Sequence, residues 1–197
     1  MRVLTRRSLH RPLAASVALG LLLSSACWAE SSDDGQSSVW APKEFQFIYQ
    51  GFTTKYSCDG LLDKVRTVLL NLGARKDLQV NSLGCVGRSG VPDPFPGVSV
   101  KMNVLVPASA ATASADEPAI PSHWKPMKLQ LDRSPLAEAG ECELVEQVKQ
   151  KILPLFTTRN VDFKSICIPH QLSPGGTSLS AEVLTADQKT AGVAAAN

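Results

Sequence analysis

The chain has 197 residues, of which 44% are hydrophobic and 19% are charged, and its formal net charge at pH 7 is +2. The first 29 positions hold 4 of the 20 basic residues and none of the 18 acidic ones, so the remainder carries 16 basic against 18 acidic residues. This balance excludes a chain whose overall charge attracts nucleic acid, and the length suits one hydrophobic core rather than two.

Residues 1–29 are typical of a secretory signal peptide. Basic residues precede the apolar run 13–23, and small side chains at Cys27 and Ala29 suit cleavage after Ala29. The run is too short to span a membrane, so we expect a periplasmic or secreted chain without a transmembrane segment. Two alternatives stay open: a twin-arginine signal at Arg6-Arg7, and an outer-membrane lipoprotein that is lipidated on Cys27.

Residues 30–43 are small and polar, which predicts a disordered leader. Residues 44–50 alternate aromatic and polar side chains and predict a strand with one buried face. A helix is predicted from Ser57 or Cys58 to residue 72, because its apolar residues form one stripe and Gly73 suits the position after a helix end. Residues 78–83 follow as a strand.

The second part of the chain begins with a Pro/Gly-rich loop at 86–97 and a strictly alternating strand at 98–106. A low-complexity stretch at 107–122 predicts a long loop, and a strand is expected at 127–131. A second helix is predicted over about 141–153, where Pro154 should end it or kink its last turn. The last predicted strand covers 161–168. We therefore expect one domain over 44–170 and a disordered tail over 171–197.

Residues 58–85 and 142–167 resemble two copies of one unit, since each reads as cysteine, amphipathic helix, turn, strand and cysteine. Two strand–helix–strand repeats and the added strand 98–106 predict an α+β fold. The expected form is a ferredoxin-like sandwich with two helices on one face of a mostly antiparallel sheet. The alternative is another α+β sheet with a different strand order.

Four cysteines remain after the signal segment, and an oxidising compartment predicts that they form two disulfides. A strand that returns directly from a helix ends beside the start of that helix. Cys58 should therefore pair with Cys85, and Cys142 with Cys167. Their wide spacing does not match a C-x-x-C redox pair or a zinc knuckle.

Two histidines, His123 and His170, are the weak candidates for a metal site after the signal segment. With Met127 or Met102 they offer the imidazole and thioether ligands that copper accepts. Both methionines also lie at inward strand positions, which favours a place in the core. No nucleophile motif or phosphate-binding loop is present, so we expect no cofactor and no catalytic site.

The loop 86–97 is the best candidate for a contact surface. Arg88 offers a charge for an anion, and Phe95 lies between two prolines that stiffen an extended backbone. The alternative is a plain connector in which Phe95 folds back onto the core.

Four short stretches carry a family resemblance: YSCDGL (56–61), DKVR (63–66), LGAR (72–75) and CELVEQ (142–147). They resemble a family of uncharacterised exported, periplasmic proteins of Gram-negative bacteria, over about residues 45–167. The resemblance implies a periplasmic location and no particular chemistry. We expect a non-catalytic, disulfide-stabilised protein that binds a periplasmic protein or another envelope component. The alternatives are a small-ligand or copper carrier and, less favoured, an unrecognised hydrolase.

Overall fold

The computed structural model describes residues 35–85, 94–110, 118–129, 141–168, 170–171 and 177–187. The expected signal peptide, including Cys27, and the predicted contact residue Arg88 lie outside these ranges. The elements in chain order are β1 (Gln36–Ile48), α1 (Cys58–Asn71), β2 (Gln79–Leu83), β3 (Gly97–Pro107), η1 (Ala108–Ala110), β4 (Ile120–Leu129), α3 (Cys142–Gln147), η2 (Val148–Ile152), η3 (Leu153–Leu155), β5 (Thr158–Lys164) and β6 (Ser178–Ala186).

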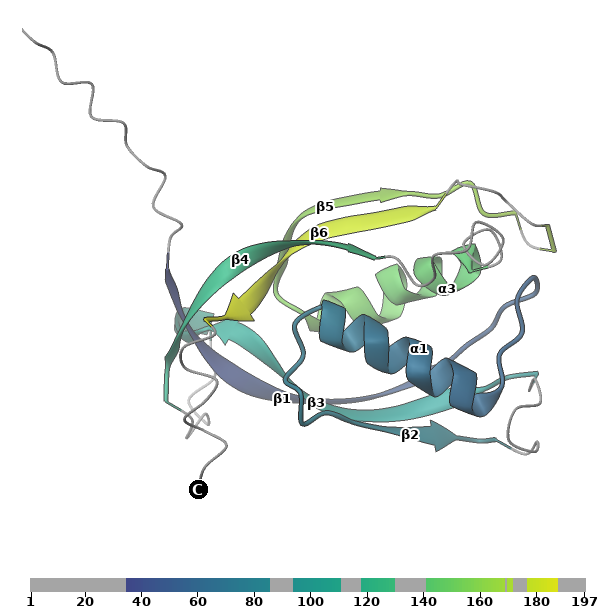
Figure 1. Cartoon of the computed structure of the whole chain (residues 1–197), viewed down its shortest axis with the longest axis horizontal. Coiled ribbons are helices and arrows are strands. Elements are labelled where there is room, and N and C mark those ends of the chain that lie inside the picture. The colour runs from purple at the N-terminus through teal and green to yellow at the C-terminus, as the bar shows by residue number, and fades with distance from the viewer. Residues whose placement is uncertain are drawn as a thin grey trace, which may run out of the picture. The chain divides into compact units, whose positions relative to one another are not determined.

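The strands form one six-stranded sheet in the order β2-β3-β1-β4-β6-β5, and every neighbouring pair is antiparallel. β1 and β4 pair over only three positions, at Gln36, Ser37 and Ser38. The two three-stranded parts diverge from this contact, and α1 and α3 lie on one face of the sheet between them (Figure 1). The protein is thus α+β, with a mostly antiparallel sheet, two helices and two disulfides.

Helix α1 forms where the sequence predicts it. The Ser57 side chain accepts a hydrogen bond from the Gly60 backbone N–H at 3.1 Å, which caps the helix start. Leu61, Val65, Val68 and Leu69 are buried along one stripe. Gly73 follows the helix with a φ of 91°, a conformation that other residues rarely adopt.

The second predicted helix is divided into three segments. The α-helix ends at Gln147, a π-helical stretch covers η2, and the 3₁₀ turn η3 contains Pro154. Proline has no backbone N–H to continue the helical ladder, and a π turn accommodates an extra residue. The buried side chains Leu144, Val148 and Ile152 still face the core through this change.

The structure corrects both predicted disordered flanks. β1 begins at Gln36, so most of the expected leader 30–43 is strand, with Val39 buried. β6 occupies Ser178–Ala186 within the expected tail 171–197, and the domain therefore extends past residue 170. Leu179, Ala181 and Val183 alternate with polar residues and are buried. The small, polar composition of the tail concealed this period-two pattern.

Two further strand boundaries differ from the prediction. β4 begins at Ile120, inside the stretch predicted as a low-complexity loop. β5 covers Thr158–Lys164, although a strand was predicted over 161–168. Its last pair is Lys164 with Ser178, the first residue of β6, so residues 165–168 have no strand beside them on that side. The sheet has six strands where five were predicted, because β6 was missed.

The two halves of the sheet have the same order of elements, with β3 between β1 and β2 and β6 between β4 and β5. Their registers correspond as well. Trp40 pairs with Leu105 as Trp124 pairs with Leu184, and the Ser38 and Ser122 hydroxyls lie 2.6 Å apart where β1 meets β4. Side chains from both halves fill one hydrophobic core.

Candidate interaction surface

The strands β1, β2, β4 and β5 all finish at the same end of the sheet, and this end also holds both disulfides. The bridges are Cys58–Cys85 and Cys142–Cys167, with Cα atoms 6.1 and 5.5 Å apart. Each joins the first residue of a helix to the segment that follows a strand, which is the pairing that the sequence predicts. We call this region the disulfide end.

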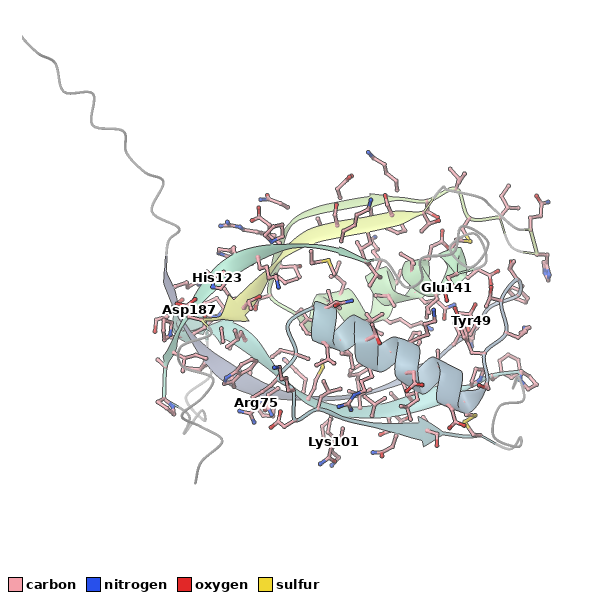
Figure 2. The ribbon with its side chains drawn as sticks, in the orientation of Figure 1. Tyr49, Arg75, Lys101, His123, Glu141 and Asp187 are labelled. Carbon is pink, nitrogen blue, oxygen red and sulfur yellow. A yellow bond between two sulfur atoms is a disulfide. The ribbon has the colours of Figure 1, made fainter. Side chains whose placement is uncertain are left out.

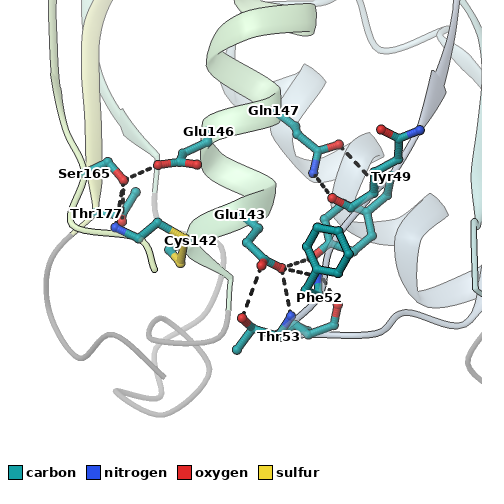
Figure 3. The surroundings of a disulfide bond; sticks show 12 residues. Tyr49, Phe52, Thr53, Cys142, Glu143, Glu146, Gln147, Ser165 and Thr177 are labelled. Carbon is teal, nitrogen blue, oxygen red and sulfur yellow. Dashed lines mark hydrogen bonds between the residues drawn. A yellow bond between two sulfur atoms is a disulfide. The ribbon is translucent and has the colours of Figure 1, made fainter. Parts of the chain in front are cut away.

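Glu143, on the first turn of α3, fixes one of these segments. Its Oε2 atom accepts hydrogen bonds from the Phe52 N–H at 2.7 Å and the Thr53 N–H at 3.0 Å, and its Oε1 atom accepts one from the Thr53 hydroxyl at 3.2 Å (Figure 3). Glu143 is buried, and a buried carboxylate is costly unless hydrogen bonds satisfy it. One turn later, Gln147 exchanges two hydrogen bonds with the Gln50 backbone. The second helix therefore holds the loop after β1.

Two buried tyrosines lie beneath this loop. Tyr49 donates its hydroxyl hydrogen to the Thr54 carbonyl at 3.0 Å, and its ring packs edge-to-face on Tyr56 at 4.9 Å. Burial raises the pKa of both tyrosines above the ordinary value, and the charge of Glu143 beside Tyr49 and of Glu141 beside Tyr56 raises it further. Both phenols therefore stay neutral. This suits structural support of the loop after β1 better than it suits acid–base chemistry.

Glu141 is the second buried carboxylate of the disulfide end. Its Oε1 atom lies 2.6 Å from the Lys64 ammonium of α1, so this ion pair joins the two helices. Within the described part of the chain, its Oε2 atom and the Tyr56 hydroxyl have no hydrogen-bond partner. The cluster as a whole ties the first half of the chain to the second.

Four large apolar side chains of the disulfide end are exposed to solvent. Phe52 is 59% exposed, Phe95 65%, Ile166 60% and Ile168 51%, and together we call them the disulfide-end surface. The centroid of the Phe52 ring lies 4.7 Å from that of His170 and 5.8 Å from the Lys55 ammonium. Exposed apolar residues that form one patch are a mark of interaction sites, and these four lie on segments at the same end of the sheet.

The backbone beneath this surface is fixed on both sides. The Pro96 carbonyl accepts a hydrogen bond from the Tyr49 N–H at 3.0 Å, so Phe95 lies beside the end of β1. Ile166 and Ile168 flank the bridged Cys167, and the Ser165 hydroxyl bonds Glu146 of α3 (Figure 3). The Phe95 side chain is mostly exposed to solvent, so the alternative that it folds back onto the core is wrong.

The two predicted metal candidates are not brought together. His123 lies on β4, where its Nδ1 atom is 2.5 Å from Asp187, at the end of the sheet opposite Tyr49 and Glu141 (Figure 2). His170 contacts Phe52 at the disulfide end. Met102 is buried in the core and Met127 packs against it. Among the residues that the structure describes, no group of three histidine, cysteine or acidic side chains could hold a metal ion.

Of the disulfide-end surface, the sequence predicted only Phe95. Phe52 was missed because a single aromatic beside Gly51 carries no periodicity. Ile166 and Ile168 were missed because they fall within the predicted strand 161–168. No helix in the described ranges is long and apolar enough to cross a membrane. Comparisons with protein-family models, curated proteins and solved structures give no match.

Proposed function

We propose that this protein is a non-catalytic binding protein of the periplasm or the extracellular space, and that it binds its partner through the disulfide-end surface. The observation that carries this proposal is the exposure of Phe52, Phe95, Ile166 and Ile168 on segments anchored by two disulfides and by Glu143. Loops on a rigid scaffold commonly carry binding function, and aromatic anchors dominate interface energies.

An exported location supports this function and belongs to the same proposal. Disulfides persist in oxidising compartments, and the N-terminal segment and the family resemblance favour export to the periplasm. The partner would be a periplasmic protein or an envelope component.

We also propose that the two halves are copies of one unit, strand–helix–strand–strand. The shared element order and the matching registers support this duplication. A ferredoxin-like relationship is then proposed for each half alone, since β1, α1 and β2 with β3 between the strands form a split β-α-β unit. Among the contacts of the described residues, none favours a ligand carrier or a hydrolase over the binding protein.

The test compares partner capture by variants of the mature, oxidised protein. Phe52→Ala and Phe95→Ala should each lower the cross-linked yield from a periplasmic extract of the host, because loss of a central aromatic weakens binding by about tenfold or more. Arg88→Ala tests the predicted charge contact in the same loop. The matched control is Val161→Ala, which shortens an apolar side chain exposed on β5, outside the disulfide-end surface.

Equal yields for the wild type, Phe52→Ala and Phe95→Ala would show that this surface is not the binding site. Disulfide content and thermal unfolding of each variant verify that the fold is intact. A loss of capture that is the same for Val161→Ala would also contradict the proposal, because the effect would not be specific to the surface.

A further inference from the structure

The sheet has two outer strands, β2 and β5, which occupy equivalent places in the two halves. Asn81 of β2 pairs with Ser99 of β3, and Lys164 of β5 pairs with Ser178 of β6. One residue earlier in each strand, the buried Val80 of β2 corresponds to Phe163 of β5. Among the residues that the structure describes, each outer strand has a paired strand on one side only, and another strand can add to such an edge by hydrogen bonding.

Only β5 carries the features that discourage strand addition. Arg159, Asp162 and Lys164 are charged, the register shifts between Arg159 and Asp162, and Asn160 has a φ of 52°. Edge charges and irregular backbone both prevent another strand from pairing. One of these charges also makes a contact within the fold, since the Arg159 guanidinium forms an ion pair with the Glu182 carboxylate of β6. The β5 edge is therefore protected.

The β2 edge has none of this protection. All five residues, Gln79–Leu83, pair with β3 without a break, and the strand contains neither a charge nor a proline. Gln79 and Asn81, at the places that Asp162 and Lys164 hold in β5, are exposed neutral amides. A side-chain amide both donates and accepts hydrogen bonds, so it is compatible with an identical group beside it.

We propose that β2 pairs antiparallel with β2 of a second copy of this chain, about a two-fold axis near Asn81. Such an interface is self-complementary, and the two sheets become one continuous sheet. The axis places the Asn81 amides of the two copies side by side and brings no two charges of β2 together. The proposal does not depend on the disulfide-end surface or on its partner.

The charges on α1 fit the same two-fold axis. α1 runs antiparallel to β2, since Cys58 is bridged to Cys85 and the Arg66 guanidinium lies 3.4 Å from the Leu78 carbonyl. The level of Asn81 therefore falls about midway between Asp59 and Arg66, which are two turns apart on one helix face. Across the axis, Asp59 of one copy lies level with Arg66 of the other, and this opposite-charge pairing occurs twice. Asp63, which is exposed between them on the same helix face, lies level with Asp63 of the other copy, so one like-charge pairing opposes the two favourable ones.

The experiment is sedimentation equilibrium and native mass spectrometry of the mature, oxidised protein. We expect a monomer–dimer equilibrium with a dissociation constant of about 1–100 µM, as is common for a small interface. Asn81→Lys gives β2 the residue that β5 has at the equivalent place, and it should weaken the dimer by at least about tenfold, because two lysines would meet at the axis.

Gln46→Lys is the matched control, since it adds the same charge at an exposed position of β1 that is not on an outer strand. It should leave the dimer unchanged. A wild-type monomer at about 100 µM would overturn the proposal, and so would a dimer that withstands Asn81→Lys as well as Gln46→Lys. Loss of the dimer together with unchanged partner capture would separate this interface from the disulfide-end surface.

Discussion

At the scale of single residues, the buried tyrosines Tyr49 and Tyr56 make stability depend on alkaline pH. Burial, and then the neighbouring charges of Glu143 and Glu141, raise the pKa of both phenols in the folded state. In the unfolded chain a tyrosine ionises at a pKa of about 10. The tyrosines therefore contribute stability that is fully present below about pH 10 and is lost as the pH rises further.

Urea unfolding between about pH 9 and pH 11 should show this loss, with a limiting slope near 1.4 kcal/mol per pH unit for each tyrosine. Tyr56→Phe should flatten the slope and should raise stability or leave it unchanged at neutral pH, because the buried Tyr56 hydroxyl has no hydrogen-bond partner among the described residues. The same alkaline slope in the wild type and in Tyr56→Phe would mean that other groups cause the loss.

At the scale of elements, each disulfide connects the first residue of a helix to the segment that begins after the next strand, β2 or β5. The bridges close loops of similar size, with sequence separations of 27 and 25 residues. In the chain-entropy model, a disulfide that closes a loop of that length stabilises the fold by about 3 kcal/mol. In addition, the Ser57 side chain caps the start of α1. The N-cap residue of α3 is Glu141, and its side chain makes no capping hydrogen bond.

Replacing either pair by alanine should lower the free energy of unfolding by about 3 kcal/mol, measured by urea denaturation. The Cys142/Cys167 variant should also increase amide hydrogen exchange in residues 165–168, because its first half-cystine anchors that segment to a helix without a side-chain cap. A loss below about 1 kcal/mol for both pairs would mean that the unfolded chain is not the state that the bridges restrict.

At the scale of the whole molecule, the two halves unfold together if their shared core governs stability. They pair directly over only three positions, yet Phe47, Val65, Leu144 and Val183 belong to one buried cluster. Beyond the expected signal peptide each half has one tryptophan, Trp40 in the first and Trp124 in the second. Cooperative unfolding of a single core should appear as one transition.

Trp40→Phe leaves a probe of the second half, and Trp124→Phe leaves a probe of the first. Both fluorescence transitions should coincide with the far-UV circular dichroism transition of the same variant. Two separated midpoints within one variant would show instead that the halves are independent folding units. Since each tryptophan stacks on an arginine, Arg75 or Arg159, both variants lose a comparable contact.

The sequence by itself determined the features that depend on neighbouring residues. Helix α1 was predictable from its Ser57 cap, its apolar stripe and Gly73, and β3 from strict alternation. The two disulfide pairings were predictable because a strand that returns directly from a helix ends beside the start of that helix. The exposure of Phe95 agrees with the interpretation of its loop as a surface, and its role as a contact residue stays a prediction.

Only the tertiary structure decided the features that depend on distant strands. The start of β1 and all of β6 are strands because β3, β4 and β5 supply their hydrogen bonds, which a small and polar composition does not reveal. Ile166 and Ile168 are exposed because β6 begins opposite Lys164 and leaves them without a neighbouring strand on that side. Glu143 reaches a loop that lies 90 and 91 residues earlier in the chain. Burial and exposure are properties of the assembled sheet, so local patterns do not determine them.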